Sequence, residues 1–373
     1  MRTYTFANGV VLKYPEEVAF SFNPILFIGS GGTCKVLRVI ASYGGKSYTV
    51  EYNGNGDCYG DLQSITQLLF TDETFELDYT QTYQKTTLCR RIQYNVSTST
   101  DGTNFAASYT VYLEVVWGAM NPNGKDIFNG FQKAKYFVGY PFTFGFYLNT
   151  TSTILIGNGA SPQTSLQITV DTNAKKGIYE LNGNQLPTTA NFSNIYDYGG
   201  TLQQGYFDNT FDLTFYMYQN VPQTLLGTID IESCGDEDAV YLRWLDRHGF
   251  WRYWLFNNKQ KQRTTSYTQD FNRTELIQYD LTFGFERGAG RRVAFARGGV
   301  LPVAVPLADA EQYAYLLDII SSPVVGLYIG KDTNNTPRWQ TVAVQAGTFT
   351  QTDKEMQDFV INVILPTTPT QRL

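Results

Sequence analysis

The stretch from Val240 to Phe256 constrains the fold of this chain more than any other, because neither of its faces suits water. Its sequence, VYLRWLDRHGFWRYWLF, holds three of the five tryptophans and the single histidine, His248. Read as two strands joined by a turn at DRHG, it presents alternate side chains to opposite faces. Both faces are largely apolar or aromatic, whereas a strand at a protein surface alternates with polar residues. The predicted hairpin therefore needs cover on both faces.

Three interpretations of this hairpin are open. It is a hairpin of the protein core, or part of a protein–protein interface, or a platform on which sugars or bases stack, with the core interpretation favoured. Trp, Tyr and Arg are the usual anchors of interfaces, and exposed aromatic rings also stack on ligands. The candidate interface or ligand-stacking residues are Arg243, Trp244, Trp251, Arg252, Tyr253 and Trp254.

The rest of the chain favours strands and turns. Tyr and Phe together number 52, only 17% of the residues are charged, and short alternating runs are separated by Gly and Asn. Such runs predict antiparallel strands, with hairpin turns at Gly44-Gly45 and at Asp101-Gly102. In the segment 140–148, Phe142, Phe144 and Phe146 fall on one face of a strand that we expect to be half-buried. We predict a mainly β protein built of β-sandwich-like antiparallel sheets.

Two short helices are expected among these strands. The segment at about 59–70 has apolar residues at helical spacing, with Asp61 as its cap, and the segment at about 308–321 has Asp309 as its cap and Pro323 after its end. We expect the apolar stripe of the second helix to include Tyr313, Leu316, Leu317 and Ile320. A stretch rich in Gly and Pro, 286–306, is expected to be a linker or an exposed loop.

The turn-rich segment 119–126 predicts a domain boundary. We expect three domains: an N-terminal β domain with the first helix (1–118), a middle β-sandwich-like domain (119–225), and a C-terminal β domain with the aromatic hairpin and the second helix (226–373). A chain of 373 residues is long enough to bury a sizeable core without disulfides or metals.

The charge is acidic overall but uneven. The net charge is -6, which argues against binding nucleic acid over a broad basic face. Residues 239–300, however, hold 11 Lys and Arg against 5 Asp and Glu, a net charge of +6, so the remainder carries -12. This segment is a solvated basic face, or a surface that docks on an acidic one in a neighbouring subunit or in nucleic acid.

Cysteine usage and apolar runs indicate where the protein resides. The four cysteines, Cys34, Cys58, Cys89 and Cys234, are far apart in the sequence and form no C-x-x-C pair, so we expect reduced thiols and no zinc site. The N-terminus lacks the apolar core of a signal peptide, and no apolar run is long enough to span a membrane. These features favour a protein made in a cytosol.

Little in the sequence points to catalysis. With His248 as the single histidine, mechanisms that need two are excluded, and no P-loop, G-x-G-x-x-G or G-x-S-x-G motif is present. Two carboxylates suffice for glycoside hydrolysis, but no pair is singled out. We expect no enzymatic activity, no catalytic residues, no cofactor and no bound metal.

Several packing motifs carry a resemblance. The run YLRWLDRHGFWRYWLF, the segments EEVAFSFNPILFIG (16–29) and YGDLQSITQLLF (59–70), and the segment ADAEQYAYLLDIISSPVV (308–325) occur in the order typical of one group. In these motifs the chain resembles uncharacterised virion structural proteins, of tail or baseplate type, from tailed phages and prophages of Bacteroidetes. The resemblance implies a virion component and no catalytic residue.

We therefore expect a non-enzymatic phage structural protein of the tail or baseplate that works by protein–protein assembly. The expected partners are other virion proteins and copies of itself, and we expect it to be assembled in the cytoplasm of a bacterial host and to end in the virion. The alternative is a tail-tip protein that binds carbohydrate or a host receptor, with host-surface glycans as its partner.

Overall fold

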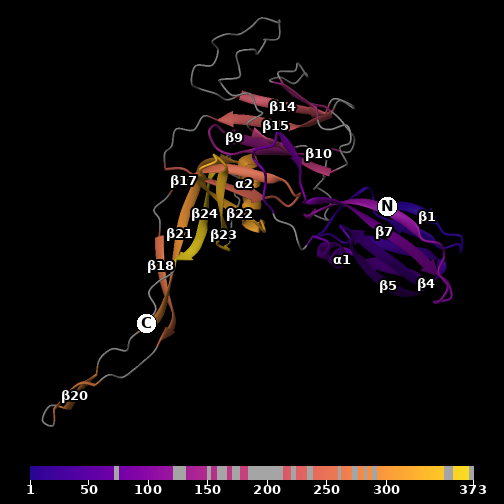
Figure 1. The fold of residues 1–373 in the computed structure, drawn as a ribbon, viewed down its shortest axis with the longest axis horizontal. Helices are drawn as coiled ribbons and strands as arrows, with labels where there is room; N and C mark the ends of the chain where they lie inside the picture. Colours follow the sequence, from indigo (N-terminus) through magenta and orange to yellow (C-terminus); the bar gives the residue numbers. More distant parts are fainter. Residues whose placement is uncertain are drawn as a thin grey trace, which may run out of the picture. The chain divides into compact units, whose positions relative to one another are not determined.

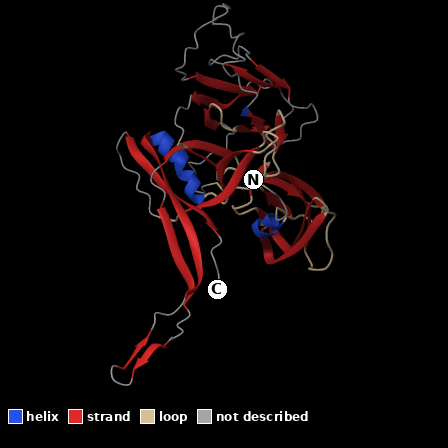
Figure 2. Cartoon of the chain, turned by 60° about the vertical axis from the view of Figure 1, so that its left-hand side comes forward, coloured by secondary structure: helices blue, strands red, loops and turns tan. Residues whose placement is uncertain are grey.

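The computed structural model describes residues 1–70, 75–120, 132–148, 153–157, 166–169, 177–183, 213–219, 224–232, 238–258, 262–270, 276–280, 284–287, 292–347 and 356–368. In this part of the chain the protein is mainly β, with several sheets and two helices, as the sequence predicts (Figures 1 and 2). It divides into two compact units. Unit 1 comprises Met1–Cys234, Leu245–Tyr253 and Lys331–Pro337, and unit 2 comprises Gly235–Trp244, Trp254–Gly330 and Arg338–Leu373. The three-domain division stays a prediction.

The N-terminal sheet of unit 1 is organised around one long strand, β4. This strand pairs with β2 and β7 and also with β5, and the sheet runs in the order β1-β2-β4-β7-β8-β3. Its pairs are antiparallel except for β3 with β8. Its strands are β1 (Arg2–Thr5), β2 (Val11–Tyr14), β3 (Val18–Phe20), β4 (Leu26–Tyr43), β5 (Lys46–Asp61), β7 (Cys89–Ser99) and β8 (Tyr109–Val116).

Both hairpin turns predicted in this sheet are present. Strands β4 and β5 meet at Gly44-Gly45, where both glycines have positive φ (57° and 81°), as the tightest hairpin turns require. Strands β7 and β8 are joined through Asp101 and Gly102. The Asp101 carboxylate accepts the backbone N–H groups of Thr103 (2.8 Å) and Asn104 (2.7 Å), and these hydrogen bonds hold its pKa far below the ordinary value.

The first helix, α1 (Gln63–Leu68), is shorter than the predicted 59–70. Residues 59–61 instead continue the strand β5, because their backbone pairs with β4 from Leu26 to Ile28. The prediction of Asp61 as the N-cap was wrong, because the N-cap position is Leu62, which makes no side-chain capping bond, and Asp61 lies one residue earlier. The Oδ1 of Asp61 accepts the backbone N–H of Gln63 and that of Ile25, both at 3.0 Å, although the helix itself begins after Leu62.

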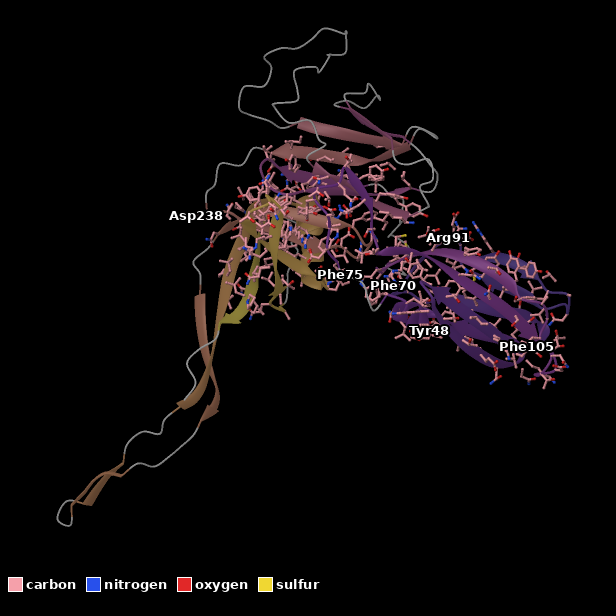
Figure 3. All side chains as sticks on the ribbon, in the orientation of Figure 1. Tyr48, Phe70, Phe75, Arg91, Phe105 and Asp238 are labelled. Carbon is pink, nitrogen blue, oxygen red and sulfur yellow. The ribbon has the colours of Figure 1, made fainter. Side chains whose placement is uncertain are left out.

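A buried arginine joins the end of this helix to the sheet. Arg90 of β7 is only 4% exposed, donates from its guanidinium to the carbonyl of Leu69, and donates from Nε to the carbonyl of Thr87 at 3.1 Å. Its guanidinium lies 4.7 Å from the ring centroid of Phe70, which is labelled in Figure 3. The carbonyl groups and the aromatic ring stabilise a cation that burial alone would disfavour.

Two further sheets belong to unit 1. One has the order β10-β13-β6, with β6 (Tyr83–Lys85), β10 (Thr143–Leu148) and β13 (Gly177–Asn182). The prediction of a half-buried strand at 140–148 was wrong, since Thr143 and Gly145 are buried as well as the phenylalanines. The other sheet has the order β12-β11-β14-β15-β9, with β9 (Gln132–Phe137), β11 (Thr153–Gly157), β12 (Leu166–Thr169), β14 (Leu213–Gln219) and β15 (Thr224–Glu232).

The sheet that contains most of unit 2 closes on itself. Its order is β17-β16-β22-β23-β24-β21-β18, and β17 also pairs with β21 through Asn257 and Ala304. Six strands therefore form a ring, and β18 adds to β21 outside it. The strands are β16 (Val240–Leu245), β17 (Trp251–Asn258), β18 (Gln262–Asp270), β21 (Arg292–Asp309), β22 (Val325–Lys331), β23 (Pro337–Val344) and β24 (Met356–Thr368). A separate pair is formed by β19 (Leu276–Asp280) and β20 (Gly284–Arg287).

The interpretation of 286–306 as a linker or loop was wrong, because most of this stretch lies in β21. The side chains of Leu301, Val303 and Val305 alternate inward and are buried, as are those of Phe359, Ile361 and Val363 on the partner strand β24. This apolar alternation stabilises the strand although Gly298, Gly299 and Pro302 lie within it.

The second helix, α2 (Ala310–Ser321), lies against strands of unit 2. It begins close to the predicted residue 308 and ends where predicted, with Asp309 as its cap: the carboxylate accepts the N–H of Gln312 at 2.7 Å. Its buried face consists of Tyr313, Leu316 and Ile319, so the prediction was right for the first two, whereas Leu317 and Ile320 are only partly buried. The ring of Tyr313 packs edge-on against Phe359 of β24.

We expect Asp309→Ala to lower the free energy of unfolding by about 1 kcal/mol, because an N-terminal N–H of α2 loses its acceptor. Urea unfolding followed by circular dichroism measures the loss. The variant Asp309→Asn keeps an acceptor oxygen and is the control, for which we expect a much smaller change. Equal losses in the two variants would contradict a capping role.

Candidate functional site

The aromatic hairpin predicted from the sequence is present, as strands β16 and β17. Its turn closes with a hydrogen bond from the Asp246 N–H to the Phe250 carbonyl (2.9 Å) and one from the Gly249 N–H to the Asp246 carbonyl (3.1 Å). Gly249 has a φ of 81°, a conformation that glycine adopts without strain. His248 lies in this turn, as expected, and is partly exposed.

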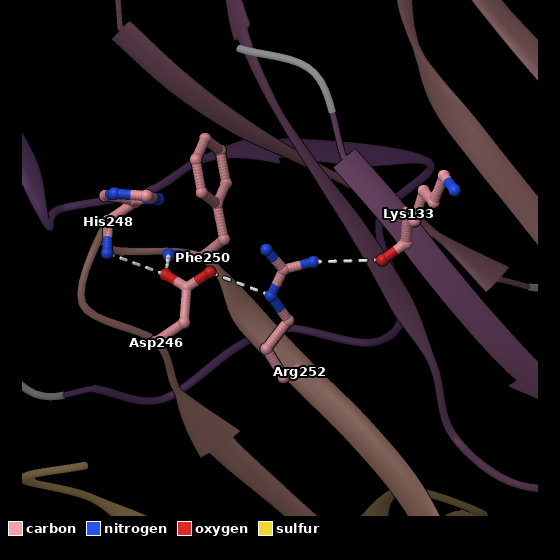
Figure 4. Close-up of polar contacts among 5 residues, drawn as sticks. All are labelled: Lys133, Asp246, His248, Phe250 and Arg252. Atoms are coloured by element: carbon pink, nitrogen blue, oxygen red, sulfur yellow. Dashed lines mark hydrogen bonds and ion pairs between the residues drawn. The ribbon is translucent and has the colours of Figure 1, made fainter. Parts of the chain in front are cut away.

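A buried carboxylate holds the turn together (Figure 4). Asp246 is 2% exposed, and its Oδ1 accepts the backbone N–H groups of His248 and Phe250, both at 2.9 Å. Its Oδ2 accepts from Nε of Arg252 at 2.7 Å, and the same guanidinium donates to the carbonyl of Lys133 at 3.1 Å. A carboxylate buried with a cation and two amide donors is well compensated. Arg252 therefore has a structural role in unit 1.

Tyr253 is a second polar anchor inside unit 1. Its ring is fully buried, and its hydroxyl lies 2.8 Å from the Thr143 hydroxyl and 3.2 Å from the Tyr79 hydroxyl. The neighbouring Trp251, 3% exposed, lines a cavity of about 50 Å³ together with residues that include Glu76 and Lys85.

An acid that sequence reasoning missed lies in the same part of unit 1. Glu180 of β13 is 1% exposed and pairs in register with Gly145 of β10. A Cβ at position 145 would come within 2.8 Å of its Oε1 and 2.6 Å of the Phe250 ring. Burial raises the pKa of Glu180 to about 8, and the Thr143 hydroxyl and Trp251 amide offset only part of that rise. The carboxyl group is therefore protonated at neutral pH.

The other half of the hairpin packs within unit 2. Trp244 is fully buried and Trp254 is 6% exposed, and their rings lie 5.6 and 5.8 Å from that of Tyr315 on α2. Arg243 is 3% exposed, with its guanidinium 4.5 Å from the ring centroid of Trp339. Arg243 faces Gly326 on β22, where the absence of a side chain leaves room for the arginine.

The structure therefore divides the six candidate residues between two cores. Trp251, Arg252 and Tyr253 belong to unit 1, and the remaining three belong to unit 2. All are buried except Arg252, which is partly exposed. Of the interpretations that the sequence leaves open, burial within a single chain favours the core hairpin. The assignment of these residues to an interface or to ligand stacking stays a prediction.

Strands β18 and β21 form a two-stranded ribbon that extends from the closed sheet of unit 2 (Figure 1). Strands β18 and β21 pair from Gln262 with Val300 to Asp270 with Arg292, whereas β24 accompanies β21 only from Arg297 onward. In the described part of the chain, no third strand pairs with β21 before Arg297 or with the outer edge of β18. The sequence singled out the charge of this region but not its shape.

Comparisons with known proteins leave the family open. No family model matches the chain, and no curated protein matches it. A solved structure described as a 1.5-MDa bacterial ice-binding adhesin retained on the host cell surface aligns over 91% of this chain and 97% of that one, at 8% identity and a TM-score of 0.19. Similarity at that level carries no argument about function.

No helix among the described residues is long and apolar enough to cross a membrane. None of their His, Cys, Asp and Glu side chains gather in groups of three or more that fit a metal ion.

The free energy of unfolding of the native protein should decline as the pH rises, and we expect the variant Glu180→Gln to lose part of that decline. Glu180 keeps its proton in the folded chain up to about pH 8, whereas the ordinary pKa of the unfolded chain is 4.5. Its contribution to stability is therefore complete below pH 4.5 and is lost as the pH rises through about 8. Urea unfolding across this range should show a smaller decline for the variant.

The control for that experiment is Glu311→Gln, which changes an exposed acid in the first turn of α2. It is expected to leave the decline as it is in the native protein. If Glu180→Gln shows the same decline as the native protein, the pKa of Glu180 does not differ between the folded and unfolded chains.

We also expect soluble oligosaccharides to leave the tryptophan fluorescence of the native protein unchanged. The reason is that the three tryptophans of the hairpin are at most 6% exposed and their rings pack inside the protein. Titration with a panel of bacterial surface polysaccharides measures this. A saturable shift that disappears in Trp254→Phe would contradict the core assignment.

Proposed function

We propose that the protein is a non-enzymatic structural component of a phage virion, of the tail or baseplate, that works through protein–protein assembly. The observation that carries this proposal is the ribbon of β18 and β21, which continues beyond the closed sheet (Figure 1). The sequence motifs that resemble virion proteins provide the context of a particle assembled in the cytoplasm of a bacterial host.

The physics of a two-stranded ribbon supports an assembly role. An isolated pair of strands is marginally stable in water, because it lacks a third strand or a packed layer to bury its side chains. Its free edges also present N–H and C=O groups that can pair with another chain. Among the described residues, β21 before Arg297 pairs with β18 alone, and β18 pairs with β21 alone. A partner that covers the ribbon would supply the missing layer.

Charge supports the same proposal and indicates the kind of partner. Residues 259–297 hold eight Lys and Arg against four Asp and Glu, a net charge of +4, so the rest of the chain carries -10. Opposite charges on two docking surfaces steer association and suppress wrong partners. A copy of the same chain or an acidic virion protein fits this requirement. Contacts between unlike surfaces of identical chains form rings when the rotation closes.

The test is a variant with a shortened ribbon. Ser266 pairs with Ala296, so residues 267–295 can be replaced by Asn-Gly, which favours a tight hairpin turn. We expect the native protein to form a discrete oligomer in mass photometry, alone or with a partner virion protein, and the shortened variant to lose it. The closed sheet should be retained, because β24 and β17 pair with β21 after Arg297.

Thermal unfolding is the control for this variant, and the melting temperature of the closed sheet is expected to change little. A matched variant keeps the ribbon and changes Arg263 of β18 and Arg292 of β21 to Glu, which separates charge from shape. Reduced association in that variant would support charge-guided docking. A shortened protein that assembles as well as the native one would overturn the role of the ribbon.

A further inference from the structure

Two cysteines that are 24 positions apart in the sequence lie on neighbouring strands in unit 1. Cys34 is in β4 and Cys58 is in β5, and both are fully buried in the same hydrophobic core. In the register of these strands, Cys34 faces Gly56 and Cys58 faces Gly29. The two cysteines are thus diagonal neighbours across one strand pair.

A β-bulge and a glycine bring the two sulfur atoms together. The register shifts between Gly29 and Cys34, so that β4 has extra residues there. A Cβ at Gly29 would come within 2.9 Å of the Cys34 Sγ, and Gly29 is the residue directly opposite Cys58. The sulfur of Cys34 therefore fills the space, opposite Cys58, that a side chain at position 29 would take.

The electrostatics of the pair agree with this proximity. Burial raises the pKa of the Cys34 thiol to about 12, and the hydrogen-bonding neighbour that raises it further is the thiol of Cys58. The Cys34 thiol also donates to the Val36 carbonyl at 3.7 Å. Both cysteines are free thiols in this structure.

We propose that Cys34 and Cys58 are a redox-convertible pair, which forms an intrachain disulfide when the protein meets a small disulfide oxidant of the glutathione type. One cysteine thiolate attacks a sulfur of the oxidant, which forms a mixed disulfide and releases one small thiol. The second cysteine thiolate then attacks the protein sulfur, which forms the Sγ–Sγ bond and releases the second small thiol. Two protons leave the cysteines, and the oxidant is reduced to two thiols.

The position of β5 sets the rate of this reaction. A buried thiol with a high pKa reacts poorly, so the first attack requires β5 to separate locally from β4. Among the described residues β5 pairs with β4 alone, so that separation breaks one ladder of hydrogen bonds. Oxidation is therefore slow in the folded chain and fast during refolding.

The disulfide would close a loop around the Gly44-Gly45 hairpin. Closing a loop restricts the unfolded chain and so stabilises the folded one. We expect the melting temperature of unit 1 to rise by roughly 5 °C on oxidation.

The experiment uses the full chain, refolded with and without oxidised glutathione, then denatured and alkylated. We expect the oxidised protein to gain two fewer alkyl groups by intact mass, and peptide mapping to find Cys34 linked to Cys58. The variant Cys89→Ser should keep this link, because Cys89 lies in a different cluster with Phe20, Val116 and Phe250. Either Cys34→Ser or Cys58→Ser should abolish it.

Peptide mapping of the native protein after oxidative refolding tests the proposal even if a serine variant does not fold. A complete set of alkylated thiols after oxidative refolding would overturn it, and so would a link that joins Cys34 or Cys58 to another cysteine. A melting temperature that rises with the correct link, and returns after reduction, would support it. None of these outcomes depends on the assembly role of the ribbon.

Discussion

The Asp246 carboxylate is the interaction on which the aromatic hairpin depends. It is buried, so its charge is tolerated only because Arg252 and two backbone amides compensate it. These bonds fix the turn, and the turn fixes the register of β16 against β17. A slip of one residue would send every side chain of a strand to the opposite face. On these strands Trp244 and Trp254 pack in unit 2, and Trp251 packs in unit 1. A single buried acid therefore constrains the packing of both units.

The sequence predicted the elements whose signals are local. Paired glycines at 44–45, a capping aspartate at 309 and the dense aromatic alternation around Trp244 each specify a conformation within a few residues. The stretch 286–306 was misread because Gly298, Gly299 and Pro302 suggested a loop, while the alternation of Leu301, Val303 and Val305 indicated a strand. Packing against β24 decided in favour of the strand.

Features that depend on distant pairing were beyond the reach of sequence reasoning. Nothing near Glu180 in the sequence shows that it faces Gly145, and only that pairing buries its carboxyl group and raises its pKa. The same holds for the candidate residues of the hairpin. Their composition favours a core but also suits an interface or a ligand platform, and only the surrounding strands and α2 show that the rings of Trp244 and Trp254 are covered.

The division of the chain into units has a consequence for its synthesis. Unit 1 takes residues from three separated stretches, the last of which ends at Pro337. During translation the N-terminal 234 residues emerge first, yet Tyr253, which contacts the hydroxyl groups of Tyr79 and Thr143, follows later. Unit 1 is therefore complete only when most of the chain has left the ribosome. For the same reason no single cut yields the two units as two continuous fragments.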